Sequence, residues 1–351
     1  MNKLMRNSTR LMMITTLACV AAGAALAQPS FTLAWSEYPS WSAFGVADEV
    51  NIIDGRKGKQ GKVEKKWNVD IVLQEAEYDP CLVMYGAGRV DAVCITNMDV
   101  LNPAMSVPSV AILPTSTSNG ADACITLKSI TDVKQLKGKK VHGLAQTVSE
   151  YCFVRNLELA GEDPDDYDFS NMDPGAAAIA MQQKQRGMDA IVVWNPFVLE
   201  TLNRRKDTHV LFDSTTIPGE IIDMVAMTQS ALAKPGGKDF ACAVIDAFYQ
   251  LNQRMAAPAT RDDTLVALGE KFSNLDLNSM KTVVKQTQFY ATPDAALGLF
   301  ESAELKATMK KVVGFCLKAG IVDNAPEVTY GTSGGKLRFD PTYIEAVAAK
   351  Q

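Results

Sequence analysis

The sequence has little histidine and no closely spaced cysteine pair, and both shortages restrict the sites that it can form. His142 and His209 are the only histidines in 351 residues. No two of the seven cysteines are separated by two residues, so the C-x-x-C spacing of zinc and redox sites does not occur. We therefore expect neither a metal nor a cofactor.

Positive charge is also in deficit. The chain has 35 lysines and arginines against 40 aspartates and glutamates, which gives a net charge of -5. Proteins that bind nucleic acid need a basic face for the phosphates. A nucleic-acid partner is therefore not expected.

Long apolar runs are missing beyond the N-terminus. The first ten residues carry three positive charges, on Lys3, Arg6 and Arg10. The apolar stretch 11–26 that follows is short for a membrane span, which needs about 20 apolar residues. It ends in Ala25-Leu26-Ala27, a pattern that signal peptidase cleaves. We expect residues 1–27 to be a signal peptide and the mature protein to be periplasmic, although Cys19 leaves lipidation as an alternative.

The remaining six cysteines mostly occupy apolar runs. Examples are "DAVCIT" and "DACITL", which are typical of buried strands. Free thiols in such places behave as small apolar side chains. Cys152, in "SEYC", follows a predicted helix start and has no evident base beside it, as a cysteine nucleophile would need. We expect no enzyme activity.

Short apolar strands alternate with helical segments over most of the chain. Strands are predicted in "FTLAW", "NVDIVLQEA", "VDAVCIT", "KKVHGLA" and "MDAIVVW". Thr147 and Glu150 have capping-box spacing and predict a helix running to Gly161, and Asp173-Pro174 predicts the start of another. The lysine-rich stretch 57–66 is expected to be a solvated loop. Two such units followed by a mostly helical region from about residue 240 indicate an α/β protein with two lobes.

Polar and aromatic residues gather where the predicted strands end. Ligands of α/β proteins bind at the carboxyl ends of the strands. The candidate ligand contacts are Trp35, Tyr38, Trp41, Asp79, Asn97, Asp99, Asn119, Asp122, Glu150, Trp194 and Asp223. Several of them have a structural role as an alternative. Trp35, Tyr38 and Trp41 could cover a lobe edge, and Trp194 could be a core residue. Asp79 and Glu150 could cap helices, and Asn119, Asp122 and Asp223 could serve the hinge.

Longer motifs resemble a known family. "QLKGKKVHGLAQTVSEYCFVRNLELAG" and "AAAIAMQQKQRGMDAIVVWNPFV" are similar to the second lobe of periplasmic substrate-binding proteins of ABC importers in the nitrate, sulfonate, taurine and thiamine-precursor group. Shorter motifs, "AWSEYPSW", "TNMD", "SNGADA", "VVWNP", "IPGEIIDM", "FYATP" and "LRFDPTYI", resemble a subfamily that accompanies urea carboxylase-type enzymes, which act on urea and guanidine. The segment 55–66 departs from the family pattern.

The resemblance implies a type II periplasmic-binding-protein fold with two crossing hinge strands. The first lobe would comprise residues 28–122 and the mostly helical 223–351, and the second lobe residues 123–222. It also implies a small-molecule ligand held between the lobes, a transient ABC permease partner in the inner membrane and a monomeric protein.

The charge of the candidate strand-end segments suggests which ligand is bound. These segments are 35–41, 77–81, 96–99, 116–123, 146–151 and 194–197, extended by 218–224. They contain eight acids, Glu37, Glu77, Asp79, Asp99, Asp122, Glu150, Glu220 and Asp223, and no lysine or arginine. Carboxylates pair with planar N–H donors, and aromatic faces attract cations. A guanidine-like or urea-like ligand is therefore favoured. A sulfonate, taurine or nitrate anion, a pyrimidine thiamine precursor, and a secreted enzyme on the same fold remain as alternatives.

Overall fold

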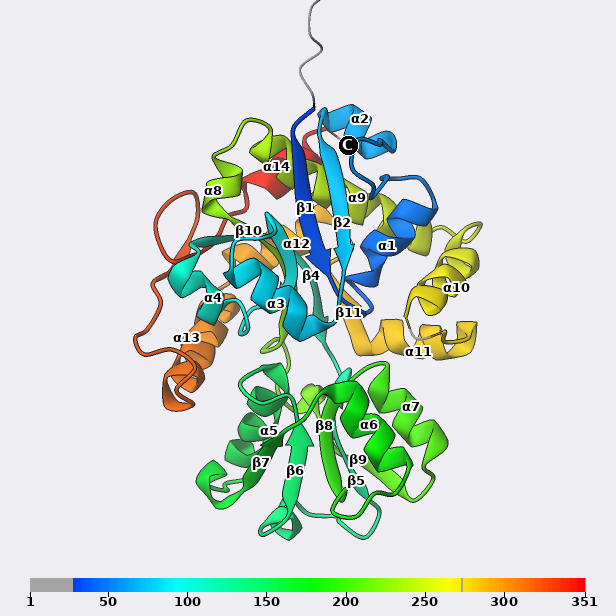
Figure 1. Cartoon of the computed structure of the whole chain (residues 1–351), viewed down its shortest axis with the longest axis vertical. Helices are drawn as coiled ribbons and strands as arrows, with labels where there is room; N and C mark the ends of the chain where they lie inside the picture. The colour runs from blue at the N-terminus through cyan, green and yellow to red at the C-terminus, as the bar shows by residue number, and fades with distance from the viewer. Residues whose placement is uncertain (1–27, 273, 351) are drawn as a thin grey trace, which may run out of the picture.

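A computed structural model describes residues 28–272 and 274–350. The predicted signal peptide, residues 1–27, lies outside them. Two α/β lobes stand one above the other, each built around its own sheet (Figure 1). The α/β class predicted from the alternation of strands and helices is confirmed.

The larger sheet contains eight strands and forms the core of the upper lobe. Its strands are β1 (Ser30–Trp35), β2 (Asp70–Glu75), β3 (Ala92–Thr96), β4 (Ser109–Ser118), β10 (Ile222–Thr228), β11 (Thr287–Phe289), β12 (Val328–Tyr330) and β13 (Leu337–Phe339). Their order is β12-β13-β4-β10-β3-β1-β2, with β11 paired to β4. Strands β3 and β10 are buried along their whole length, which explains their mostly apolar sequences; the charged exception within β10 is Asp223.

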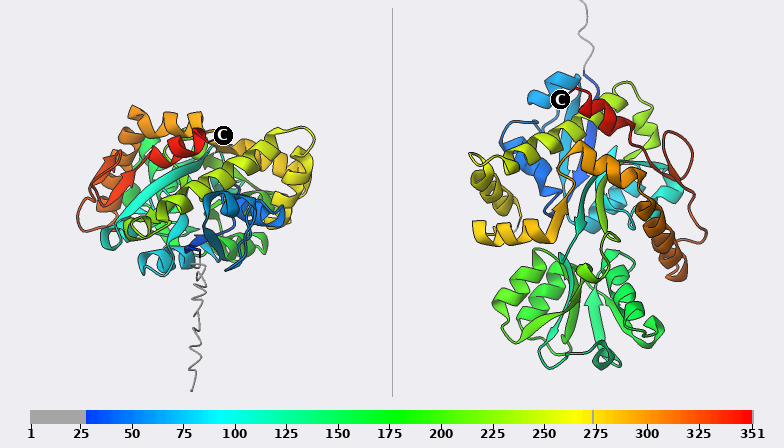
Figure 2. Two further views of the ribbon diagram at one scale, coloured as in Figure 1. Left: turned by 90° about the horizontal axis from the view of Figure 1, so that it is seen from above. Right: turned by 180° about the vertical axis from the view of Figure 1, so that it is seen from behind.

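Helices cover both faces of this sheet. They are α1 (Ser42–Glu49), α2 (Lys62–Trp67), α3 (Tyr78–Gly86), α4 (Leu101–Ser106), α8 (Gln229–Leu232), α9 (Gly237–Ala256), α10 (Arg261–Lys271), α11 (Leu277–Gln286), α12 (Pro293–Glu301), α13 (Ala303–Lys318) and α14 (Thr342–Ala348). Helices α3 and α4 lie in front, whereas α9, α12 and α14 pack together behind (Figures 1 and 2). No helix within the described residues is long and apolar enough to cross a membrane.

The smaller lobe is a five-stranded sheet with helices on both sides. Its strands are β5 (Asp122–Leu127), β6 (Lys140–Gly143), β7 (Asp168–Asn171), β8 (Ala190–Trp194) and β9 (Thr208–Asp213), in the order β7-β6-β8-β5-β9. Its helices are α5 (Val148–Leu159), α6 (Pro174–Gln182) and α7 (Phe197–Arg204), and short 3-10 turns cover Val133–Leu136, Pro164–Asp166 and Ser214–Thr216.

The chain crosses between the two sheets twice. It leaves the larger sheet at the end of β4 and enters the smaller one at β5; it returns from β9 to β10. Strand β10 then inserts between β3 and β4, antiparallel to both. The lobe bounds expected from the sequence stay a prediction at the level of single residues.

The stretch 57–66 differs from expectation, because its second half is helical. In α2 the side chains of Val63, Glu64 and Trp67 are buried although three lysines share the helix. The Glu64 carboxylate accepts hydrogen bonds from the backbone N–H groups of Asp54 and Gly61, both at 2.6 Å, and of Ile71 at 2.8 Å. This carboxylate organises the preceding loop and ties it to β2.

Two helix starts also differ from prediction. At α5, Thr147 is the N-cap, but Glu150 accepts from the N–H of Gln146, at 2.6 Å, rather than from the cap residue itself. At α3 the N-cap position is occupied by Glu77, so Asp79 lies exposed in the first turn. The predicted start of α6 at Asp173-Pro174 is found, with Asp173 accepting from Ala176 N–H at 2.9 Å.

Candidate functional site

A small cavity lies where the two sheets meet. It is lined by Tyr38, Trp41, Tyr78, Thr96, Asp122, Val148, Trp194, Ile221 and Asp223, and its volume is at most about 250 Å³. Strand register brings these residues together: Asp223 pairs with Thr96 in the larger sheet, and Asp122 pairs with Trp194 in the smaller one. The cavity is therefore built from strand ends of both lobes.

Four aromatic rings form one wall, which we call the aromatic cage (Tyr38, Trp41, Tyr78 and Trp194). Tyr38 and Trp41 occupy the turn between β1 and α1, with ring centroids 4.8 Å apart. Trp41 stacks on Tyr78 at 5.3 Å, and Tyr78 meets Trp194 edge-on at 5.8 Å. Because Trp194 belongs to the smaller lobe, the last contact joins the two lobes.

Three aspartates supply the charge of the cavity. Asp122 and Asp223 line it, and Asp99 lies behind Tyr78, whose hydroxyl donates to Asp99 Oδ2 at 2.7 Å. Thr96 also donates to this oxygen, at 2.9 Å. Among the residues that the structure describes, no lysine or arginine lines the cavity.

Burial keeps these carboxylates from ionising easily. It raises the pKa of Asp99 to about 6, although hydrogen bonds from Tyr78 and Thr96 limit the rise. Burial, together with the charge of Asp99, raises the pKa of Asp122 to about 7. The pKa of Asp223 is raised well above its usual value by burial and by the other two aspartates. Such a group of like charges is costly unless a cation or a proton is present.

Several polar atoms around the cavity are buried and incompletely hydrogen-bonded. The Tyr38 hydroxyl, the Trp41 indole N–H and Asp99 Oδ1 are all buried without a hydrogen bond of ordinary geometry. Burial and the nearby Asp223 hold the pKa of Tyr38 well above its usual value, so its hydroxyl keeps its proton. Unsatisfied buried groups are rare and costly. Tyr38 faces Asp223 and Thr287, and Asp99 faces the Val148 N–H. The Trp41 N–H is therefore the donor left for a ligand.

A second hollow adjoins the cage on the other side of Tyr78 and Trp194. Its lining includes Glu37, Glu77 and Asp79, and its volume is at most about 450 Å³. Burial and the neighbouring acids raise the pKa of Glu37. Negative charge therefore extends from the three aspartates towards the outside.

Other predicted contacts lie away from the cavity. Trp35 packs in the core against Gly45, and the Asn97 amide is used within the hinge, donating to Glu220 O and accepting from Ile222 N–H. Asn119 is exposed, and its backbone N–H donates to Gln286 O. Glu150 lies in a separate groove beside α13. Asp79 reaches only the outer hollow and an adjoining groove.

Sequence reasoning missed four residues that line the cavity. Tyr78 and Thr96 lie in the candidate segments 77–81 and 96–99, in which Asp79, Asn97 and Asp99 were predicted as the contacts. Val148 and Ile221 are apolar, and nothing in their sequence distinguishes them from core residues. Tyr78 could have been found from the sequence, because it lies between Glu77 and Asp79 at the start of a helix, and these acids would suit a cation.

Neither metal binding nor cysteine chemistry has support at this place. Within residues 28–272 and 274–350, no three His, Cys, Asp or Glu side chains are arranged to hold a metal ion. The six cysteines of this part of the chain are free and buried. Burial raises the pKa of Cys152 well above its usual value, so its thiol stays protonated and is a poor nucleophile.

Solved structures with the same arrangement are numerous. The aliphatic sulphonate binding protein SsuA of Escherichia coli is 17% identical with a TM-score of 0.64, covering 84% of this chain and 89% of that one. The fold is that of the periplasmic binding proteins. The alkanesulfonate-binding SsuA of Xanthomonas axonopodis pv. citri, bound to MOPS, is 15% identical with a TM-score of 0.66 over 85% of this chain and 96% of its own.

The periplasmic-binding-protein fold also occurs outside bacterial transport proteins. A conserved Candida albicans gene product with this fold is 15% identical, with a TM-score of 0.61 over 84% of this chain and 92% of its own. No family model matches the sequence, and no curated protein matches it. At such identities the similarity establishes the fold and leaves the ligand to be argued from the cavity.

Proposed function

We propose that the protein is the periplasmic substrate-binding component of an ABC importer and that it captures a small, planar, nitrogen-rich cation of the guanidinium type. It binds this ligand without converting it chemically, as a monomer that docks transiently on its permease. The observation that carries the proposal is the convergence of three buried aspartates, with no basic side chain lining the cavity.

The charge argument separates a cation from an anion. A carboxylate about 4 Å from a ligand charge contributes roughly 4 kcal/mol at an effective dielectric constant of about 20. The start of α5 at Val148 lines the cavity and offers a helix N-terminus, which by itself favours an anion. Near neutral pH Asp99 is largely ionised and opposes an anion, whereas a cation would draw off the protons that burial leaves on Asp122 and Asp223, so a cation is favoured over a sulfonate.

The aromatic cage favours the same ligand class. Planar N–H groups pair with carboxylates through two parallel hydrogen bonds, and tryptophan or tyrosine faces add about 0.5–2 kcal/mol for a cation. Asp99 does not line the cavity, and it acts on a ligand through its charge from behind Tyr78. The unfilled space between the cage side chains is about 10 Å³, room for one water molecule, so a planar ligand of a few heavy atoms enters only if these side chains move apart.

A neutral urea-like ligand is the second candidate. With its pKa raised to about 7, Asp122 carries a proton over much of the neutral range and can donate a hydrogen bond to a carbonyl oxygen. A protonated aspartate together with the Tyr38 hydroxyl would suit urea. The two candidates differ in their response to pH, since only the cation needs an ionised carboxylate, which Asp99 supplies above about pH 6.

Calorimetry with guanidinium, urea, taurine and nitrate tests the proposal. We expect guanidinium to bind at one site per chain and to bind at least tenfold more weakly to the Asp99→Asn variant. Asp79→Asn is the matched control, because Asp79 is exposed and lies outside the cage; it should change the affinity little. Binding of taurine but not guanidinium, or undiminished guanidinium binding by Asp99→Asn, would refute the assignment.

A further inference from the structure

A contact between α5 and α13 joins the two lobes on one side of the molecule. On α13 the residues facing the smaller lobe and its return crossing are Thr308, Lys311, Phe315 and Lys318, spaced three or four apart and thus on one helix face. Phe315 meets Tyr151 of α5 edge-on, with ring centroids 5.2 Å apart. Figure 1 shows α13 reaching down beside the smaller lobe. We call this contact the interlobe seam.

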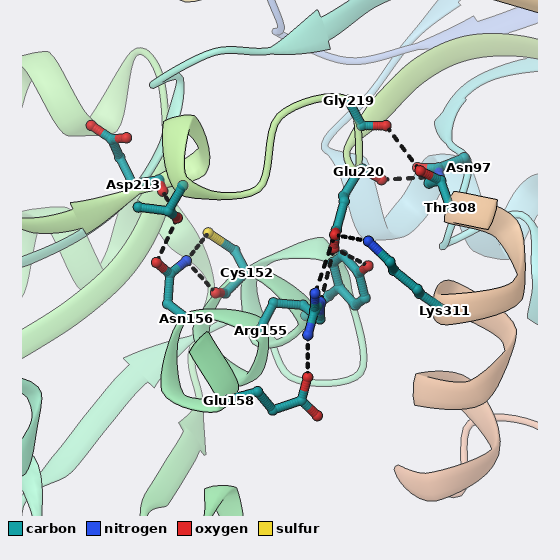
Figure 3. A network of polar contacts seen from close by, with 12 residues as sticks. Asn97, Cys152, Arg155, Asn156, Glu158, Asp213, Gly219, Glu220, Thr308 and Lys311 are labelled. Atoms are coloured by element: carbon teal, nitrogen blue, oxygen red, sulfur yellow. Dashed lines mark hydrogen bonds and ion pairs between the residues drawn. The ribbon is translucent and has the colours of Figure 1, made fainter. Parts of the chain in front are cut away.

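Glu220 lies at the centre of the seam (Figure 3). Its carboxylate accepts from Arg155 Nε at 2.9 Å and from the Tyr151 hydroxyl at 2.7 Å, both on α5. On the other side it accepts from Lys311 Nζ of α13 at 2.5 Å. One side chain therefore holds a helix from each lobe.

The backbone around Glu220 is fixed as well. The Asn97 side chain donates to Glu220 O at 3.1 Å and accepts from Ile222 N–H at 3.0 Å. Thr308 of α13 donates to Gly219 O at 3.4 Å. Glu220 thus stands on the return crossing itself, directly before β10, where a change of lobe angle must be accommodated.

The charges of the seam are well matched. Burial acts to raise the pKa of Glu220, but hydrogen bonds from Arg155, Lys311 and Tyr151 outweigh it and lower the pKa to about 2. The Glu220 side chain is 7% exposed and Arg155 17%, whereas Lys311 is 49% exposed. Arg155 also pairs with Glu158 on its own helix. The pair with Arg155 is thus the better shielded from salt, and the pair with Lys311 is the accessible one.

We infer that Glu220 is an interlobe latch: by bonding α5 and α13 at once it stabilises the closed arrangement, and α13 thereby sets the balance between closed and open forms. If the lobes separate along the seam, the contact between Phe315 and Tyr151 is lost, and Glu220 keeps only one of its two basic partners, since Arg155 stays with α5 and Lys311 with α13. Whatever the ligand, its apparent affinity then depends on the closed fraction that the latch maintains.

The inference is tested first without ligand. Small-angle scattering is compared for the wild type, Glu220→Gln, Lys311→Met and the control Lys310→Met, which replaces an exposed neighbour on the same helix outside the seam. We expect Glu220→Gln and Lys311→Met to have a larger radius of gyration than the wild type, and Lys310→Met to match it. Identical profiles for all four proteins would overturn the latch.

Ligand affinity gives a second readout. We expect guanidinium to bind about tenfold more weakly to Glu220→Gln and a fewfold more weakly to Lys311→Met, with the control unchanged; equal affinities would count against the latch. This readout alone rests on the proposed function, because the scattering comparison needs no ligand. If Glu220→Gln fails to fold, Lys311→Met decides the matter, since Lys311 is half exposed and its loss leaves the core intact.

Discussion

Replacing Asp122 by asparagine is expected to stabilise the ligand-free protein at alkaline pH while removing cation binding. Asp122 is 2% exposed, and its pKa is raised from 3.8 to about 7. A rise of this size corresponds to roughly 4 kcal/mol in favour of the protonated form. Asparagine has a similar shape and cannot ionise, so Asp122→Asn avoids this cost.

The sign of the effect follows from proton linkage. The folded protein binds the Asp122 proton more tightly than the unfolded chain, so this carboxyl stabilises the fold fully below pH about 4, and that stabilisation is lost as the pH rises through 7. The wild type should therefore be less stable at pH 8 than at pH 5 by this contribution, and Asp122→Asn should lack it. After allowing for the cost of burying an amide, we expect a gain on the order of 2 kcal/mol at pH 8 and little change at pH 5.

Thermal unfolding at both pH values measures the gain, because the common denaturants urea and guanidinium are themselves candidate ligands. Any co-purified ligand is first removed by dialysis against denaturant and refolding, because a bound ligand would mask the effect. Asp323→Asn, an exposed carboxylate elsewhere, is the control and should leave the free energy of unfolding unchanged. An Asp122→Asn protein that is no more stable than the wild type at pH 8, or equally stabilised at both pH values, would refute the reasoning.

Three further outcomes are expected. Guanidinium affinity should fall about tenfold per pH unit on acidification below about pH 6, since the cavity must lose a proton to accept the cation, and calorimetry showing a flat profile from pH 5 to 8 would contradict it. Glu64→Gln should cost about 1–3 kcal/mol in thermal unfolding, because an amide N–H₂ then faces backbone donors, and a stability equal to the wild type would refute this. Gly45→Ala should destabilise α1 by about 1–3 kcal/mol despite the usual helix preference for alanine, since its Cβ would lie 2.9 Å from Trp35; a raised melting temperature would be the opposite result.

The alternation of strands and helices could be predicted because buried strands such as β3 and β8 are unbroken apolar runs. Helix α2 was missed because three lysines dominate its sequence. The spacing of Val63 and Trp67, four residues apart, does indicate one buried helix face. The buried charge of Glu64 had no local signal, since its partners are backbone groups that only the folded loop brings near.

For the site, sequence identified the right segments but could not rank residues within them. Asp99 and Asn97 are two positions apart, yet one faces the cage through Tyr78 while the other is used by the hinge. Trp35 and Tyr38 differ in the same way. Trp35, the last residue of β1, packs in the core, whereas Tyr38 in the following turn lines the cavity. The role of Glu220 was hidden for a different reason: its partners Arg155 and Lys311 are 65 and 91 residues away in the chain.

The insertion of β10 between β3 and β4 constrains the order in which the protein can fold. The smaller sheet uses one continuous segment, from β5 to β9, whereas the larger sheet lacks a central strand until β10 has been added. The bond from the Thr117 hydroxyl to Ile221 O already spans 104 residues of chain. During vectorial synthesis the smaller lobe is therefore complete while the larger one is still unfinished. The larger lobe supplies most of the aromatic cage, and Asp223 of β10 also lines the cavity. The ligand site is therefore complete only after β10 has been added.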